Sequence, residues 1–261
     1  MTIAIFDSGA GGLTVLNTFL KLNCPANFIY FADHQHLPYG EKRAEVVSQY
    51  VLDSVEFLAK KKIDALIVAC NTATSLAIKE LRNKTKFNFP IFGMEPAVKL
   101  AVDQLKNQGI DKKAQILITA SNITANSQQL AHLKQRFSEK ANFSTIVLGK
   151  LVKFVENDCF DQEIINSYLK RKIKSKKKFD AIVLGCTHFS FFKENFINLF
   201  PKSLILDGNS GTALHAIKQL KLECPKNQQM KGKKAKISFY FSKKRNIQLE
   251  KQYQDLLKKL D

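Results

Sequence analysis

The sequence lacks three features, and each absence excludes a class of protein. No apolar run approaches the roughly 18–20 residues that a membrane-crossing helix requires, so we expect no membrane partner. The opening MTIAIFDSGAGG has neither the basic start nor the long apolar middle of a secretion signal, and Thr2–Phe6 reads better as a first strand. No C-x-x-C or H-x-x-x-H pair occurs, so we expect no structural zinc and no bound metal.

The cysteines also argue against a disulfide framework. There are five of them, an odd number, and they are widely spaced along 261 residues. They are Cys24, Cys70, Cys159, Cys186 and Cys224. Such usage, without a secretion signal, predicts a protein of the reducing cytoplasm.

Acidic residues are few: 23 Asp and Glu stand against 41 Lys and Arg, for a net charge of +18. Such a surplus can indicate nucleic-acid binding, which we keep as an alternative of a different class and which salt-dependent affinity would support. The lysines, however, lie in short clusters at Lys60–Lys62, Lys176–Lys178, Lys231–Lys236 and Lys243–Arg245, without interleaved aromatics. We interpret them as solvated surface, whose field could draw in an acidic substrate, and expect no nucleic-acid partner.

Short apolar runs alternate with amphipathic stretches along the whole chain. The predicted strands are Ile3–Phe6, Phe28–Ala32, Ala65–Ala69, Pro90–Phe92, Gln115–Thr119, Ser144–Leu148, Ala181–Leu184, Leu204–Leu206 and Ala235–Phe241. Helices are predicted at Arg43–Leu58, at Gln162–Lys174 with Asp161 as N-cap, and at Lys243–Leu260. The alternation predicts an α/β fold of mainly parallel sheets flanked by helices, with ligands at the carboxyl ends of the strands.

The sequence also contains an internal repeat. The segment Asp64–Thr72 (DALIVACNT) resembles Asp180–His188 (DAIVLGCTH), 116 positions later. A fainter match relates Ile3–Ser8 to Ile116–Ser121, offset by 113. Two matches with similar offsets predict two related α/β domains, with an active site in the cleft between them.

The internal repeat draws attention to Cys70 and Cys186, because each lies at the end of a predicted strand and the start of a predicted helix. Backbone N–H groups and the helix dipole favour a thiolate there. Buried cysteines are commonly small apolar side chains, and this is our interpretation of Cys24, Cys159 and Cys224. Two thiols that enter one cleft from opposite sides can invert a stereocentre, because one removes a proton and the other returns one to the far face.

The neighbouring residues indicate a small anionic substrate. Asp7, Ser8 and Gly9 follow the first predicted strand. Short donors at helix starts, Asn71, Thr72 and Thr187, suit a carboxylate, together with their backbone N–H groups. The segment Pro38-Tyr39-Gly40 reads as a loop that could close over the site.

Four motifs of the sequence, taken together and in order, resemble those of one known family. They are Phe6-Asp7-Ser8-Gly9, Pro38-Tyr39-Gly40, Ala69-Cys70-Asn71-Thr72-Ala73 and Gly185-Cys186-Thr187-His188. Their order and spacing resemble those of the glutamate racemases, over almost the whole chain. The resemblance implies an amino-acid racemase that interconverts L- and D-glutamate without a cofactor and supplies D-glutamate for bacterial peptidoglycan.

The resemblance also implies roles for individual residues. Cys70 would act as the base for the D-enantiomer and Cys186 as the base for the L-enantiomer. Asp7, His188 and Glu156 would assist the proton transfers. The implied substrate-binding positions are Asp7, Ser8, Pro38, Tyr39, Gly40, Asn71, Thr72, Ser121, Thr124, Thr187 and His188.

The family fold implies a second domain, residues 96–207, inserted into a first domain of residues 1–95 plus 208–261. Homodimers are common in the family. The chain departs from the family at Ala120-Ser121-Asn122-Ile123-Thr124, where Gly-Thr-x-x-Thr is usual, and at Ser190, where proline is usual. Lys150 and Lys153 make the stretch before Glu156 more basic than usual.

Two rival enzymes remain open. The first is a racemase for aspartate or another acidic amino acid, which turnover of glutamate against aspartate would separate. The second is a cysteine hydrolase that uses Cys186 with His188. That rival leaves Cys70 idle, so a Cys70→Ala variant would keep its hydrolytic activity.

Overall fold

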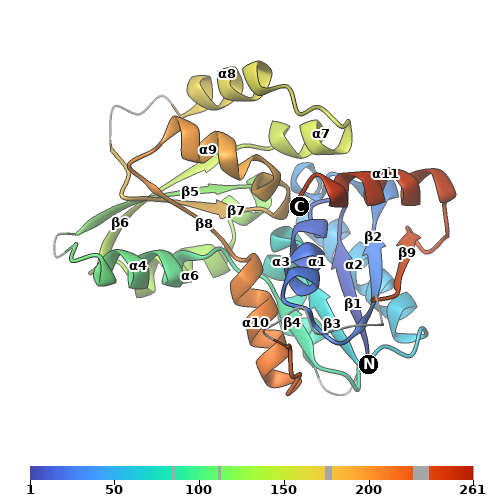
Figure 1. The fold of residues 1–261 in the computed structure, drawn as a ribbon. Helices are drawn as coiled ribbons and strands as arrows, with labels where there is room; N and C mark the ends of the chain where they lie inside the picture. The colour runs from blue at the N-terminus through green and yellow to red at the C-terminus, as the bar shows by residue number, and fades with distance from the viewer. Residues whose placement is uncertain (84–85, 111–112, 174–177, 226–234, 261) are drawn as a thin grey trace.

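The computed structural model describes residues 1–83, 86–110, 113–173, 178–225 and 235–260, which form two parallel sheets flanked by helices (Figure 1). The first sheet has the order β4-β3-β1-β2-β9 and the second β6-β5-β7-β8. The strands are β1 Thr2–Asp7, β2 Asn27–Ala32, β3 Ala65–Val68, β4 Ile91–Gly93, β5 Ala114–Ala120, β6 Ala141–Val147, β7 Ala181–Gly185, β8 Leu204–Asp207 and β9 Ile237–Phe241. The predicted α/β class is confirmed.

Helices cover both faces of each sheet, which explains why the strands are apolar on both sides. In β1, Ile3 and Ile5 pack toward α1, while Ala4 and Phe6 pack toward α2 and α3. In the second sheet α7, α8 and α9 cover one face, and α4 and α6 the other (Figure 1). The helices are α1 Leu13–Lys21, α2 Ala44–Ala59, α3 Asn71–Leu81, α4 Val98–Asn107, α5 Asn122–Ala125, α6 Gln128–Arg136, α7 Lys150–Glu156, α8 Gln162–Lys172, α9 Lys193–Leu199, α10 Asn209–Gln219 and α11 Ile247–Lys258.

The two sheets repeat one topology. The order β4-β3-β1-β2 matches β8-β7-β5-β6, and the register Ile3 to Ala65 matches Ile116 to Ala181. The two aspartates that begin the matching sequence segments, Asp64 and Asp180, make equivalent hydrogen bonds. The carboxylate of Asp64 accepts from the backbone N–H of Thr2, and that of Asp180 from Gln115, both at 2.7 Å. The predicted relation between the two halves of the chain is confirmed.

The C-terminal part of the chain returns to the first sheet. Helix α10 packs against α1, β9 pairs with β2 at the sheet edge, and α11 packs over β9 (Figure 1). We call β1–β4, β9 and their helices the first half, and β5–β8 with theirs the second half. The boundaries 1–95 plus 208–261 and 96–207 stay a prediction.

The N-cap residues mark where two of the predicted helices begin. Asp161 caps α8 as predicted, since its Oδ1 accepts from the Ile164 N–H at 2.9 Å. The last helix was predicted from Lys243, which is wrong. Ser242 and Lys243 have positive φ angles of 44° and 73°, so the chain turns there and α11 begins after its cap, Asn246.

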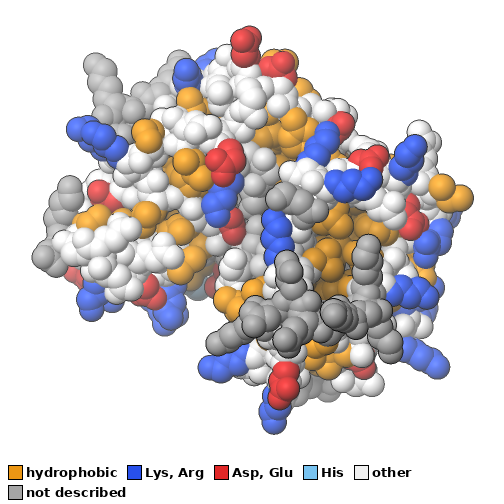
Figure 2. Space-filling model, viewed as in Figure 1, with side chains coloured by type: hydrophobic (Ala, Val, Ile, Leu, Met, Phe, Trp, Pro, Cys, Tyr) orange, Lys and Arg blue, Asp and Glu red, His pale blue; other side chains and the backbone are white. Residues whose placement is uncertain are grey.

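Lysines and arginines are dispersed over the face seen in Figure 2, with acidic side chains among them. This distribution fits a solvated surface better than a nucleic-acid stripe. Lys174, Lys176, Lys177 and the predicted cluster positions 231–234 lie outside the described residues. Within the described ranges, no helix is both long and apolar enough to cross a membrane.

Candidate active site

The carboxyl ends of the central strands bring the two cysteines to one cavity of about 150 Å³. Cys70 follows β3, and Cys186 follows β7 at the equivalent place in the second half. The predicted residues that line the cavity are Ser8, Pro38, Tyr39, Gly40, Cys70, Thr72, Ser121, Cys186, Thr187 and His188. The other predicted site residues, Asp7, Asn71, Thr124 and Glu156, are in contact with lining residues or adjacent to them in the chain.

Cys70 is the N-cap of α3. Its sulfur accepts from the Ala73 N–H at 3.5 Å and lies 3.8 Å from the Ser8 hydroxyl. Burial and then the nearby carboxylate of Asp7 raise the pKa of the Cys70 thiol from 9.0 to about 12, although the Ala73 hydrogen bond opposes part of that rise. The resting Cys70 is therefore a thiol and a proton donor. The thiolate expected from its place at a helix start is wrong for Cys70, because burial outweighs the hydrogen bond from the helix N-terminus.

Cys186 lies beside a buried histidine. Its sulfur is 4.0 Å from Nδ1 of His188, whose Nε2 is 2.6 Å from Oε1 of Glu156. Burial alone would lower the pKa of His188, but its hydrogen bonds to Cys186 and Glu156 and the negative charge of Glu156 raise that pKa well above its usual range. A protonated ring donates to Glu156 from Nε2 and can donate toward the Cys186 sulfur from Nδ1.

Glu156 comes from the end of α7 in the second half and is held largely by the first half. Its Oε1 accepts from the Ala10 N–H at 2.7 Å, and its Oε2 accepts from the Tyr253 hydroxyl at 3.4 Å. Burial alone would raise the pKa of Glu156, but the hydrogen bond and charge of His188 lower it. Glu156 and His188 thus form a buried ion pair on the Cys186 side of the cavity.

Asp7 is fully buried at the end of β1. Its Oδ1 accepts from the Gly9 N–H at 2.9 Å, and its Oδ2 accepts from the Thr187 hydroxyl at 3.0 Å. Burial raises the pKa of Asp7 from 3.8 to about 6, although the charge of His188 opposes that rise. This carboxyl can therefore change its protonation near neutral pH.

Hydroxyls from both halves meet at another wall of the cavity. The Thr72 hydroxyl at the start of α3 is 2.8 Å from that of Ser121, which caps α5 and is 3.0 Å from the Thr124 hydroxyl. The altered Ala120–Thr124 segment thus keeps both hydroxyls in place. Asn71 donates to the Met94 carbonyl at 3.4 Å, and its buried Oδ1 has no hydrogen-bond partner within the described ranges.

Gly11 allows the first loop to reach the second half. A Cβ atom at this position would lie 2.3 Å from the Thr187 Oγ1 and 2.4 Å from the His188 Nδ1. Only a residue without a side chain fits there.

Asp33 was missed by sequence reasoning. It is buried directly after β2, and its Oδ2 accepts from the Tyr39 hydroxyl at 2.6 Å. Its Oδ1 accepts from Ser242 at 3.0 Å, and both oxygens contact His36. Asp33 therefore ties the Pro38–Gly40 loop to the end of β9. Its position at a strand end, like that of Asp7, was the signal that could have revealed it.

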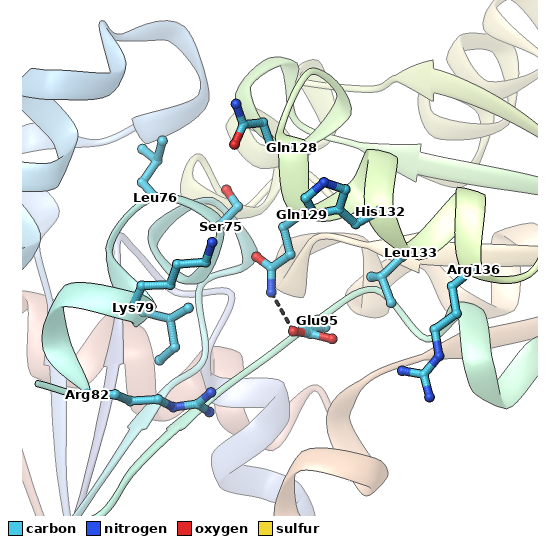
Figure 3. A pocket seen from close by; sticks show the side chains of 11 residues that line it. Ser75, Leu76, Lys79, Arg82, Glu95, Gln128, Gln129, His132, Leu133 and Arg136 are labelled. Carbon is cyan, nitrogen blue, oxygen red and sulfur yellow. Dashed lines mark hydrogen bonds between the residues drawn. The ribbon is translucent and has the colours of Figure 1, made fainter.

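A second cavity, of about 490 Å³, is larger than the one that holds the cysteines. It lies between α3 and α6, where Figure 3 shows Lys79 and Arg82 facing His132 and Arg136. Gln129 donates to Glu95 across it. No thiol lines this second cavity, so the cavity that holds Cys70 and Cys186 is the candidate active site. Within the described ranges, no cluster of three His, Cys, Asp or Glu residues could hold a metal ion.

Comparison with known proteins shows the family to which the chain belongs. A family model described as Asp/Glu/hydantoin racemase matches residues 29–216. The chain belongs to the Asp/Glu/hydantoin racemase family. The glutamate racemase of Halothermothrix orenii is 40% identical over 263 residues, 100% of both chains. Glutamate racemase 2 of Bacillus subtilis is 40% identical over 93% of this chain and 89% of its own.

A solved structure agrees with these relatives. The crystal structure of glutamate racemase from Campylobacter jejuni superposes with a TM-score of 0.81 at 28% identity, over 99% of this chain and 98% of that chain. The resemblance to glutamate racemases read from the four motifs is thereby confirmed.

Proposed function

We propose that this member of the racemase family interconverts L-glutamate and D-glutamate through Cys70 and Cys186. The observation that carries the proposal is the shared cavity: two cysteines from equivalent strand ends of related halves line it together. Full-length relatives at 40% identity are named glutamate racemases, which supports glutamate as the substrate.

Starting from L-glutamate, Cys186 removes the Cα proton, and Cys70 delivers a proton to the opposite face. The high pKa of Cys70 suits this direction, since the thiol carries the proton to be delivered. The buried pair of His188 and Glu156 serves the Cys186 side. The reverse reaction exchanges the two roles, and Asp7 assists at Cys70.

The substrate carboxylates are held by hydroxyls and backbone N–H groups. Thr72 and Ser121 offer adjacent hydroxyls at the starts of α3 and α5, and Thr187 begins its own 3₁₀ helix beside Cys186. The other members of the proposed binding set are Asp7, Ser8, Pro38, Tyr39, Gly40, Asn71 and His188, with Thr124 supporting Ser121. The Asn71 Oδ1 is a buried acceptor with no hydrogen-bond partner within the described ranges, and Asn71 directly follows Cys70, which supports its place in the proposed set.

Purified protein tests this proposal directly. Polarimetry on L-glutamate and on L-aspartate, without pyridoxal phosphate or added metal, is expected to show loss of rotation for glutamate. Faster turnover of aspartate would transfer the assignment to an aspartate racemase, and no change with either amino acid would refute it.

We further propose that the enzyme acts in the cytoplasm, where it supplies D-glutamate for peptidoglycan, and that it forms a homodimer. All five cysteines are free thiols, which suits a reducing compartment. Depletion of the protein in its own bacterium is expected to cause lysis that added D-glutamate prevents. Light scattering on the eluted protein is expected to give twice the mass of the 29.6 kDa chain.

A further inference from the structure

We propose that the C-terminal helix α11 holds the Glu156–His188 pair in place, with Tyr253 as a positioning residue for proton transfer at Cys186. The inference rests on the proposed racemisation, because it assigns a role within the same site. Residues 247–258 contribute nothing to the cavity wall, yet they contact the end of the helix that carries Glu156.

Three contacts join α11 and its last turn to the C-terminal end of α7. The Tyr253 hydroxyl donates to Glu156 Oε2 at 3.4 Å, and Gln252 donates to the Glu156 carbonyl at 3.1 Å. Lys259 reaches Asp158 at 2.5 Å. The last carbonyls of a helix have no partner within that helix, so the Gln252 contact caps α7 from outside. Figure 1 shows α11 running beside α7 above the first sheet.

Tyr253 cannot move freely to make other contacts. Its side chain is fully buried, with its ring edge-on to Phe241 at 4.9 Å and to Tyr30 at 6.0 Å. The same hydroxyl is 3.4 Å from Nδ1 of His34. A rigid aromatic body therefore holds one hydroxyl in place between Glu156 Oε2 and His34 Nδ1.

The two oxygens of Glu156 are served by different parts of the protein. Oε1 receives the Ala10 N–H and the His188 ring, whereas Oε2 receives Tyr253. Loss of the Tyr253 donor lets the carboxylate rotate away from His188. The imidazolium that faces the Cys186 sulfur is then less well held, while nothing changes beside Cys70.

A positioning role for Tyr253 can be distinguished from a general loss of stability, because it slows proton transfer at Cys186 only. Enantiomers have equal free energy, so any variant must change kcat/KM equally in both directions. The rate-limiting proton transfer, however, shifts to Cys186 alone. Removal of deuterium from L-[2-²H]glutamate by Cys186 should then show a larger primary isotope effect, and removal from D-[2-²H]glutamate by Cys70 should not.

The test uses Tyr253→Phe, which keeps the ring and removes the hydroxyl. We expect kcat/KM to fall roughly tenfold, as for loss of a hydrogen bond to a charged group, with the isotope effect rising only for the L-enantiomer. The control is Tyr240→Phe, because Tyr240 packs its ring on Phe57, away from Glu156. Equal isotope effects from both enantiomers, or the same change in the control, would overturn the proposal.

A second readout does not depend on glutamate turnover. Mass spectrometry of alkylated peptides gives the rates at which iodoacetamide modifies Cys186 and Cys70. In Tyr253→Phe the Cys186 rate is expected to fall about threefold relative to the Cys70 rate. An unchanged ratio contradicts the role of α11 even if the wild-type protein proves inactive on glutamate. If Tyr253→Phe does not fold, Gln252→Ala is judged by the same ratio.

Discussion

The hydroxyl of Thr187 donates to Oδ2 of Asp7 at 3.0 Å, joining residues 180 positions apart in the chain. The contact links the end of β1 in the first half to the segment after β7 in the second. It places a fully buried carboxyl between the two cysteine-bearing loops. Such a group is useful for proton transfer but costly to ionise.

The Asp7→Asn variant is expected to be more stable but less active. The pKa of Asp7 rises from 3.8 to about 6 on folding, so the folded state binds this proton more tightly than the unfolded state. The unfolding free energy of the wild type therefore falls as pH rises from 3.8 to about 6. The shift corresponds to ~3 kcal/mol, an upper limit for the gain in Asp7→Asn above that window.

Thermal melts from pH 4 to pH 8 check this expectation. The difference between variant and wild type should grow from pH 4 to about pH 6 and then level off, as the pKa of Asp7 requires. The matched control is Asp103→Asn, since Asp103 is an exposed carboxylate on α4. A difference that is constant over the whole range would contradict the buried, titrating carboxyl.

Gly11→Ala should damage the site by crowding it. The added methyl group would overlap the positions of Thr187 and His188. We expect a loss of about 1–3 kcal/mol in stability from overpacking, and a fall of roughly 100-fold in kcat/KM from displaced groups.

The matched control for that change is Gly211→Ala. Gly211 lies in α10, and a Cβ atom there meets nothing within 4 Å. This variant is expected to gain about 0.5–1 kcal/mol, because alanine favours a helix over glycine. Similar activity losses in the two variants would argue against the close approach at Gly11.

Thr72 and Ser121 should prove energetically coupled across the two halves. Their hydroxyls are 2.8 Å apart at the cavity wall. In a double-mutant cycle of Thr72→Val and Ser121→Ala, we expect a coupling of about 1 kcal/mol in kcat/KM for glutamate. Strict additivity of the two single variants would show that these hydroxyls act separately.

Each of the two cavity cysteines should be needed for racemisation. Cys70→Ala and Cys186→Ala are each expected to lower the rate by roughly 10²–10⁴-fold, as for loss of a general acid or base. Cys159→Ala is the control, because Cys159 is a free thiol outside the cavity lining. Full racemisation by Cys70→Ala would contradict the two-thiol mechanism, and hydrolysis of an acyl substrate that survives in this variant would favour a hydrolase based on Cys186.

The strand-and-cysteine pattern was readable from sequence because it is local. Buried parallel strands give short apolar runs, and the repeated DAxxxxC segment marked Cys70 and Cys186 as counterparts. The paired anchors of Asp64 and Asp180 show why those aspartates recur: each fixes the start of the first strand in its half.

Contacts between distant segments were not readable in this way. Asp33 and Tyr253 meet their partners only after β9 and α11 return to the first half. No spacing in the sequence records that Tyr253 lies against Glu156, 97 positions away. The start of α11 was misplaced for a local reason, because the lysine-rich stretch hid the turn at Ser242 and Lys243.

The central claim, two thiols acting on opposite faces of one carbon, is tested most directly in D₂O. L-Glutamate is incubated with the protein, and both enantiomers are separated and examined for deuterium at Cα early in the reaction. If Cys186 removes the proton and Cys70 delivers one from solvent, the first D-glutamate formed carries deuterium while the remaining L-glutamate is still protiated. D-Glutamate that retains the original hydrogen would show a single base returning its own proton and would contradict the account.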